Sequence, residues 1–151
     1  MDFNVVSNSA EETIEIGRKI GLQLKGGEVI AVCGPLGSGK THLIKGIAAG
    51  AGAKDSRSVS SPTFVIVKEY TGRIDVYHID AYRINSLEEF EMLGFDDFCY
   101  RQSAVLIEWA DKIESALAGI DCIRIELSHT GQTQREIRIE NMPEHIVLRG
   151  A

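Results

Sequence analysis

The residues with the clearest chemical signature form the segment GPLGSGKT, from Gly34 to Thr41. Its recurring glycines tolerate backbone angles and close approaches that a Cβ atom would block, so successive N–H groups can surround phosphate oxygens. Lys40 brings a positive charge for the terminal phosphates of a nucleotide, and the Thr41 hydroxyl can bind Mg²⁺. The pattern predicts a nucleotide site whose contacts come from the following residues: Leu36, Gly37, Ser38, Gly39, Lys40 and Thr41.

The elements around this segment suit a phosphate site. The preceding run from Val29 to Cys33 is continuously apolar, as is typical of a buried strand. The residues after it, KTHLIKGIAAGAG, have helix-forming content that ends in glycines. The N-terminus of such a helix favours negative charge and would face the anion. The sequence thus predicts the order of strand, loop and helix that the motif requires.

Acidic residues at strand ends are the candidates for the rest of the chemistry. Hydrolysis requires a second protein anchor for Mg²⁺ and a group that orients the attacking water. Asp80 ends the predicted strand IDVYHID, and Glu108 ends AVLIE. We expect both beside the phosphates, although either could be an ordinary carboxylate that caps a turn, and spacing does not decide their roles. Trp109, the only tryptophan, follows directly and borders the site or packs in the core.

The segment SSPTF, from Ser60 to Phe64, lies between the predicted helix and the next strand. Many nucleotide-binding proteins keep a switch there that senses the terminal phosphate. Ser61 or Thr63 would supply its hydroxyl, and a plain turn is the alternative. The chain contains no [NT]KxD motif for guanine, which favours ATP over GTP.

Composition is consistent with one domain over residues 1–151, since 44% of the residues are hydrophobic and 25% charged. The three cysteines form no CxxC pair, which argues against a disulfide framework and a zinc site. A formal net charge of -6 gives no general attraction to RNA, so contact with tRNA would run through a partner. No apolar run approaches the roughly 20 residues that span a bilayer, and a cytoplasmic protein without membrane contact is expected.

Alternating strands and helices predict an α/β fold with a mostly parallel central sheet flanked by helices and an antiparallel C-terminal portion. Ser9 and Glu12 have the spacing of a capping box and predict a helix that ends near Gly21. Other helices are expected near Ser86 and Trp109. The segment SLEEFEMLGFDDF is expected to form an amphipathic helix on the core, with a partner-docking surface as the alternative. Further strands are expected in TFVIVKEY, IDVYHID, AVLIEW, CIRIELS and REIRIE.

Four ordered segments resemble the TsaE family, small bacterial P-loop ATPases of tRNA threonylcarbamoyladenosine biosynthesis. They are GPLGSGKT, SPTF, HIDAYRI followed by LEEFEMLGFDDF, and VLIEW. The resemblance extends from SAEET to QREIRI. It implies an ATPase that uses ATP and Mg²⁺ and acts on the TsaD and TsaB proteins. Those proteins attach a threonylcarbamoyl group to adenosine 37 of tRNAs that read ANN codons, so this chain would meet tRNA only indirectly.

The resemblance also implies roles for single residues. Lys40 would contact phosphate, Thr41 and Glu108 would bind Mg²⁺, and Asp80 would assist the hydrolytic water. Lys40 and Asp80 would thus be the catalytic residues.

Other implied roles lie around this centre. Ser61 and Thr63 would belong to a switch, and Trp109 would respond to nucleotide or partner. Arg135 would lie near the nucleotide base. The chain departs from the family at Pro35, where members commonly have Asp.

Two other functions fit the same motif. A small-molecule kinase would need an arginine-rich lid over the phosphates, yet the arginines between the predicted helix and Glu108 are few and scattered. A binding module would use ATP only to select its docking conformation. The regulatory ATPase is the favoured function, and the kinase is the main alternative.

Overall fold

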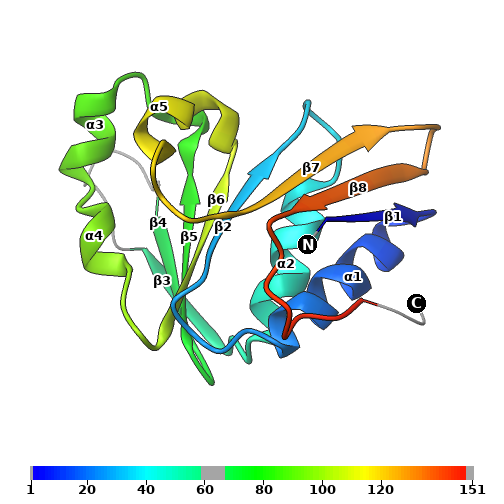
Figure 1. Ribbon diagram of the computed structural model, residues 1–151, viewed down its shortest axis with the longest axis horizontal. Helices are drawn as coiled ribbons and strands as arrows, with labels where there is room; N and C mark the ends of the chain where they lie inside the picture. Colours follow the sequence, from blue (N-terminus) through cyan, green and yellow to red (C-terminus); the bar gives the residue numbers. More distant parts are fainter. Residues whose placement is uncertain (1, 59–66, 149–151) are drawn as a thin grey trace.

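A computed structural model describes residues 2–58 and 67–148, and it places one mixed sheet of eight strands within them (Figure 1). The strand order is β1-β8-β7-β2-β6-β5-β4-β3. The strands are β1 Phe3–Ser7, β2 Val29–Cys33, β3 Asp55–Ser58, β4 Val67–Thr71, β5 Asp75–Asp80, β6 Ser103–Glu108, β7 Ile123–His129 and β8 Arg135–Glu140. The helices are α1 Ala10–Leu22, α2 Lys40–Gly50, α3 Leu87–Met92, α4 Phe95–Phe98 and α5 Glu114–Leu117, with 3₁₀ turns η1 Ala81–Arg83 and η2 Ala110–Ile113.

The centre of the sheet is parallel, as predicted. β2 lies between β6 and β7, β5 lies beside β6, and these four strands run in the same direction. Every residue of β2 and of β6 is buried. Continuous apolar runs are expected where helices cover both faces of a parallel sheet. The α/β fold with a parallel centre is therefore confirmed.

Both edges of the sheet are antiparallel. The C-terminal strands β7 and β8 pair as expected, and β1, which the sequence did not predict, adds to β8. At the other edge, β4 is antiparallel to β5 and to the unpredicted β3. The sequence did not predict the antiparallel pairings at this edge of the sheet. Only residues 72–74 separate β4 from β5, and a parallel crossover needs a dozen or more residues.

Two layers cover the sheet. α1 and α2 pack on one face, and the turns and short helices η1, α3, α4, η2 and α5 belong to the other, each over its own apolar cluster. α1 begins as predicted, because Ser9 Oγ accepts a hydrogen bond from the Glu12 N–H at 3.1 Å. Among the described residues, no helix is long and apolar enough to cross a membrane.

Four glycines bring α1 and α2 into backbone contact. Gly17 and Gly21 lie on α1, and Gly46 and Gly50 lie on α2. A Cβ atom at any of them would come within 2.3 Å of a backbone oxygen of the opposite helix. The two helices therefore approach more closely than larger residues would permit. Because α2 starts at the end of the predicted phosphate loop, this contact ties the loop to α1.

The predicted helix over SLEEFEMLGFDDF is divided into α3 and α4. Gly94 has a left-handed φ of 75° between them, which ends α3 and redirects the chain. Phe90 and Phe95 are buried as expected, whereas Leu87 is 50% exposed. One continuous helix was therefore wrong, although the apolar packing was right in part. The helix expected near Trp109 is present as η2 followed by α5.

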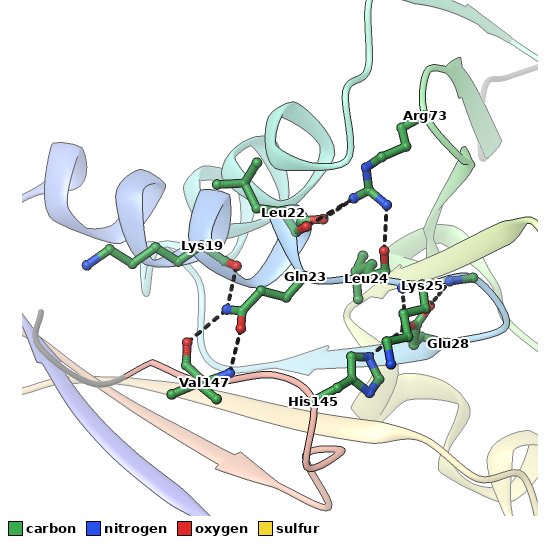
Figure 2. A network of polar contacts seen from close by, with 11 residues as sticks. Lys19, Leu22, Gln23, Leu24, Lys25, Glu28, Arg73, His145 and Val147 are labelled. Carbon is green, nitrogen blue, oxygen red and sulfur yellow. Dashed lines mark hydrogen bonds and ion pairs between the residues drawn. The ribbon is translucent and has the colours of Figure 1, made fainter.

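A polar network fastens the far end of α1 (Figure 2). The Gln23 side chain exchanges two hydrogen bonds with the backbone of Val147, each 2.8 Å long. Arg73 donates to Gly21 O at 2.8 Å and to Leu24 O at 2.6 Å, which satisfies carbonyls at the C-terminus of the helix. The network therefore fixes α1 to both the β4–β5 turn and the C-terminal segment.

Candidate nucleotide site

The loop between β2 and α2 has the backbone of a phosphate cradle. Gly34, Gly37 and Gly39 have φ values of 148°, 77° and 100°, which lie in the left-handed range that favours glycine. A Cβ atom at Gly34 would come within 2.6 Å of both Leu127 O and Ser38 Oγ. Gly39, the N-cap of α2, provides no side-chain cap, so the helix start can donate its N–H groups to an anion.

Lys40 is the first residue of α2 and is only 4% exposed, and its side chain reaches back to this loop. Its Nζ donates to Gly34 O at 2.6 Å and to Pro35 O at 2.9 Å, and lies 3.6 Å from the ring centre of Trp109. Burial lowers the pKa of Lys40, and the neighbouring Glu108 carboxylate opposes that shift. The ammonium therefore lies within the cradle, beside carbonyl oxygens and an aromatic face.

Glu108 faces the start of α2. Thr41 Oγ1 donates to Glu108 Oε2 at 2.9 Å, and His78 Nε2 contacts Glu108 Oε1 at 2.9 Å. Burial alone would raise the pKa of Glu108, but the hydrogen bonds from His78 and Thr41 and the positive charge of Lys40 bring it below its ordinary value. The carboxylate is therefore stabilised in its charged form.

This pair of oxygen ligands fits Mg²⁺. The cation prefers oxygen, and nucleotide sites commonly hold it through one or two protein groups together with phosphates and waters. Thr41 and Glu108 supply such groups beside the cradle, joined by the hydrogen bond from Thr41 Oγ1 to Glu108 Oε2. Among the described residues, no cluster of three or more His, Cys, Asp or Glu side chains forms a complete metal site. The donor set thus suits a metal that arrives with a nucleotide.

Asp80 ends β5 directly beside Glu108, since the two residues are register partners. Its Oδ1 accepts a hydrogen bond from the Tyr82 N–H at 3.0 Å and so caps η1. One carboxylate oxygen of Asp80 therefore caps a turn, which was the alternative to a role in the site. Asp80 nevertheless also lies next to Glu108, where a second acid was expected.

A cavity of about 340 Å³ opens over the loop. It falls within the size range of small-molecule sites. Arg135 reaches it from β8 and donates to Gly37 O at 3.2 Å. The lining residues are Ser9, Ala10, Thr13, Leu36, Gly37, Gly39, Lys40, Thr41, His42, Glu108, Trp109, Gln132, Thr133 and Arg135. Most of the predicted site residues are thus brought together.

Among the described residues, two predicted site residues, Asp80 and Ser38, do not line this cavity. Ser38 is fully buried beneath the cavity, and its Oγ has no hydrogen-bond partner among the described residues. Ser61 and Thr63 lie outside the residues that the structure describes, so the switch stays a prediction.

Trp109 borders the site rather than filling the core. It is partly buried, has an unusual positive φ of 61°, and packs against Tyr82 with ring centres 4.9 Å apart. The Nζ atom of Lys112 lies over the Tyr82 ring, 4.6 Å from its centre. Trp109 therefore links the buried Lys40 to the surface near η1.

Sequence reasoning missed several residues of the site. The sequence analysis assigned no role to His78, yet its side chain contacts Glu108. A signal was available, because His78 and Asp80 are two positions apart and so share a face of β5. Ser9 and Thr13 at the start of α1, and Gln132 and Thr133 between β7 and β8, gave no such signal.

Comparison with known proteins identifies relatives that match most of the chain. The family described as "Threonylcarbamoyl adenosine biosynthesis protein TsaE" matches residues 7–137. A Treponema pallidum protein named tRNA threonylcarbamoyladenosine biosynthesis protein TsaE is 36% identical over 134 residues, which cover 89% of this chain and 97% of the relative. A Bacillus subtilis protein of the same name is 41% identical over 128 residues, 84% of this chain and 78% of the relative.

A solved structure has the same fold. The crystal structure of Bacillus subtilis YdiB superimposes with a TM-score of 0.74 at 32% identity and covers 92% of this chain and 84% of that chain.

Proposed function

Because the chain belongs to the TsaE family of threonylcarbamoyl adenosine biosynthesis proteins, we propose that it binds and hydrolyses ATP with Mg²⁺. The hydrolysis would regulate or reset the TsaD–TsaB complex that modifies tRNA, and the chain would contact tRNA only through that complex. The protein would act in the cytoplasm. It would turn over slowly without its partners.

One observation carries this proposal. The glycine-rich loop, Lys40 and the Thr41–Glu108 pair converge at one cavity, although Glu108 is 67 positions from Thr41 in sequence. A glycine-rich turn without a binding function would not require the buried Lys40 ammonium and the charged Glu108 carboxylate beside it. A nucleoside triphosphate with its cation complements both.

Each residue would contribute a separate effect. Backbone N–H groups of the loop would bind phosphate oxygens, and Lys40 would exchange its carbonyl partners for them and neutralise their charge. Thr41 and Glu108 would hold Mg²⁺, which when bound withdraws electron density from the phosphate. Asp80 would orient the attacking water through the carboxylate oxygen that does not cap η1.

The surroundings fit a site that is closed by a partner. Trp109 and Tyr82 form an aromatic pair between Lys40 and the surface, and Tyr82 is 52% exposed. A protein that packs on this pair would contact the residue beside the phosphate-binding lysine. We propose that TsaD and TsaB sense the nucleotide by this route.

Reconstitution tests the function. ATP hydrolysis and tRNA threonylcarbamoylation are measured with the chain alone, with TsaD and TsaB, and with all the proteins together. We expect hydrolysis to rise with the partners and modification to require the chain. The Lys40→Ala variant is the site-specific control. It should abolish both the rise in hydrolysis with the partners and the tRNA modification. Phosphate transfer to a metabolite would select the kinase, and modification supported without hydrolysis would select the binding module.

A further inference from the structure

Two side chains, those of Thr41 and His78, contact the carboxylate of Glu108. The function proposed above gives His78 no role. Thr41 Oγ1 donates a hydrogen bond to Glu108 Oε2, and His78 Nε2 contacts Glu108 Oε1 at 2.9 Å. The side chains of His78 and Glu108 are 15% and 10% exposed, so solvent competes little for this contact. A hydrogen bond in such surroundings restricts the carboxylate more than a surface contact would.

The sheet explains how the two residues meet. Asp80 is opposite Glu108 in the parallel pair of β5 and β6, and His78 is opposite Leu106. Residues two apart share a face, so His78 lies diagonally behind Glu108 on the face that α2 covers. The imidazole is long enough to span this diagonal. A histidine at this place therefore approaches the carboxylate from the side opposite Thr41.

We propose that His78 is a positioning residue that holds Glu108 Oε1, so that Oε2 and the Thr41 hydroxyl point together toward the magnesium of a bound nucleotide. The inference rests on the proposed function, because it assigns a task to the same site. Ionised carboxylates only accept hydrogen bonds, so His78 must carry its proton on Nε2. Partners of this kind fix the orientation of metal ligands, and their loss commonly lowers metal affinity about 10- to 100-fold.

Two amide substitutions separate positioning from simple packing. The amide nitrogen of glutamine is as many bonds from Cβ as histidine Nε2, whereas that of asparagine is one bond nearer. His78→Gln can therefore replace the donor, and His78→Asn leaves a gap. Lys68→Asn is the matched control, because Lys68 is exposed and pairs with His78 from β4.

The measurement is the affinity for a nonhydrolysable ATP analogue, by calorimetry, in Mg²⁺ and in EDTA. The ratio of the two affinities is the magnesium coupling. We expect His78→Asn to lower this ratio about 10- to 100-fold without changing the affinity in EDTA. His78→Gln and Lys68→Asn should keep the ratio of the unaltered protein. An unchanged ratio in His78→Asn, or an equal loss in both His78 variants, would overturn the inference.

A measurement on the unaltered protein guards against variants that do not fold. Nitrogen-15 NMR of the histidine rings reports which nitrogen carries the proton. Protonation of His78 at Nε2 supports the inference, and a neutral ring with its proton on Nδ1 overturns it.

The magnesium coupling distinguishes failure of the proposed metal site from failure of the positioning role of His78. If the unaltered protein shows no magnesium coupling, the metal site of the proposed function is wrong and the inference falls with it. If that coupling is present but insensitive to His78, the proposed function stands and only the positioning role is lost.

Discussion

Replacing Gly46 with alanine tests whether close packing of α1 and α2 holds the glycine-rich loop before α2 in place. The added Cβ would lie 2.1 Å from Ile14 O, 2.9 Å from Ile14 C and 3.0 Å from Arg18 N, all backbone atoms of α1. Ordinary van der Waals contact begins at 3.4 Å, so α1 and α2 must separate by about 1 Å or more. A flexible side chain could move aside, but a helix backbone cannot yield without shifting its neighbours.

The expected loss of stability follows from two opposing effects. Overpacking a well-filled interior costs about 1–3 kcal/mol. Alanine is a better helix former than glycine by about 1 kcal/mol. Because the clash involves rigid backbone, we expect Gly46→Ala to lower the free energy of unfolding by about 1–2 kcal/mol. For a domain of this size, that corresponds to a fall in Tm of about 2–8 °C.

Thermal and urea unfolding followed by circular dichroism measure this effect. Ala49→Gly is the matched control, because Ala49 is exposed on the same helix and the substitution alters propensity without changing the contact. It should cost about 1 kcal/mol. The separation of the helices should also weaken ATP binding in Gly46→Ala and spare it in Ala49→Gly. A stabilised Gly46→Ala protein would refute the packing argument, since propensity would then outweigh the clash.

Other predictions concern the site itself. Lys40→Ala should weaken ATP binding in calorimetry by about 10- to 100-fold, the usual worth of a hydrogen bond to a charged group, and retained affinity would remove its phosphate role. Glu108→Ala should weaken binding only when Mg²⁺ is present, while Asp80→Ala should spare binding and slow turnover in a phosphate-release assay; equal losses of affinity would refute this division. The fluorescence of Trp109 should change when Mg-ATP is added, because its ring faces the Lys40 ammonium. An unchanged emission spectrum would show that the nucleotide does not bind close to Trp109.

The site could be predicted in its local parts. The GPLGSGKT segment specifies its own conformation, because glycines permit the left-handed angles and a buried strand and a helix bound the loop. Asp80 and Glu108 were identified because each ends a predicted strand, and strand ends converge at one edge of a parallel sheet. The capping serines at positions 9 and 86 also act within their own helix starts.

Other features depend on which segments become neighbours. The chain order does not reveal that β3 and β1 complete the sheet at its two edges, because short polar or weakly apolar strands gain their pairing from partners distant in sequence. Likewise, the sequence does not show that the glycines of α1 and the glycines of α2 pack against the backbone of the opposite helix.

The sequence by itself determined that this protein has a glycine-rich loop between a strand and a helix, a parallel core and two acidic strand ends, because those properties arise from neighbouring residues. Only the tertiary structure decided that Thr41 and His78 share one carboxylate, that Arg135 reaches the loop, and that Trp109 covers Lys40. These contacts join residues far apart in the chain, and their geometry follows from strand register and helix packing, which no local pattern specifies.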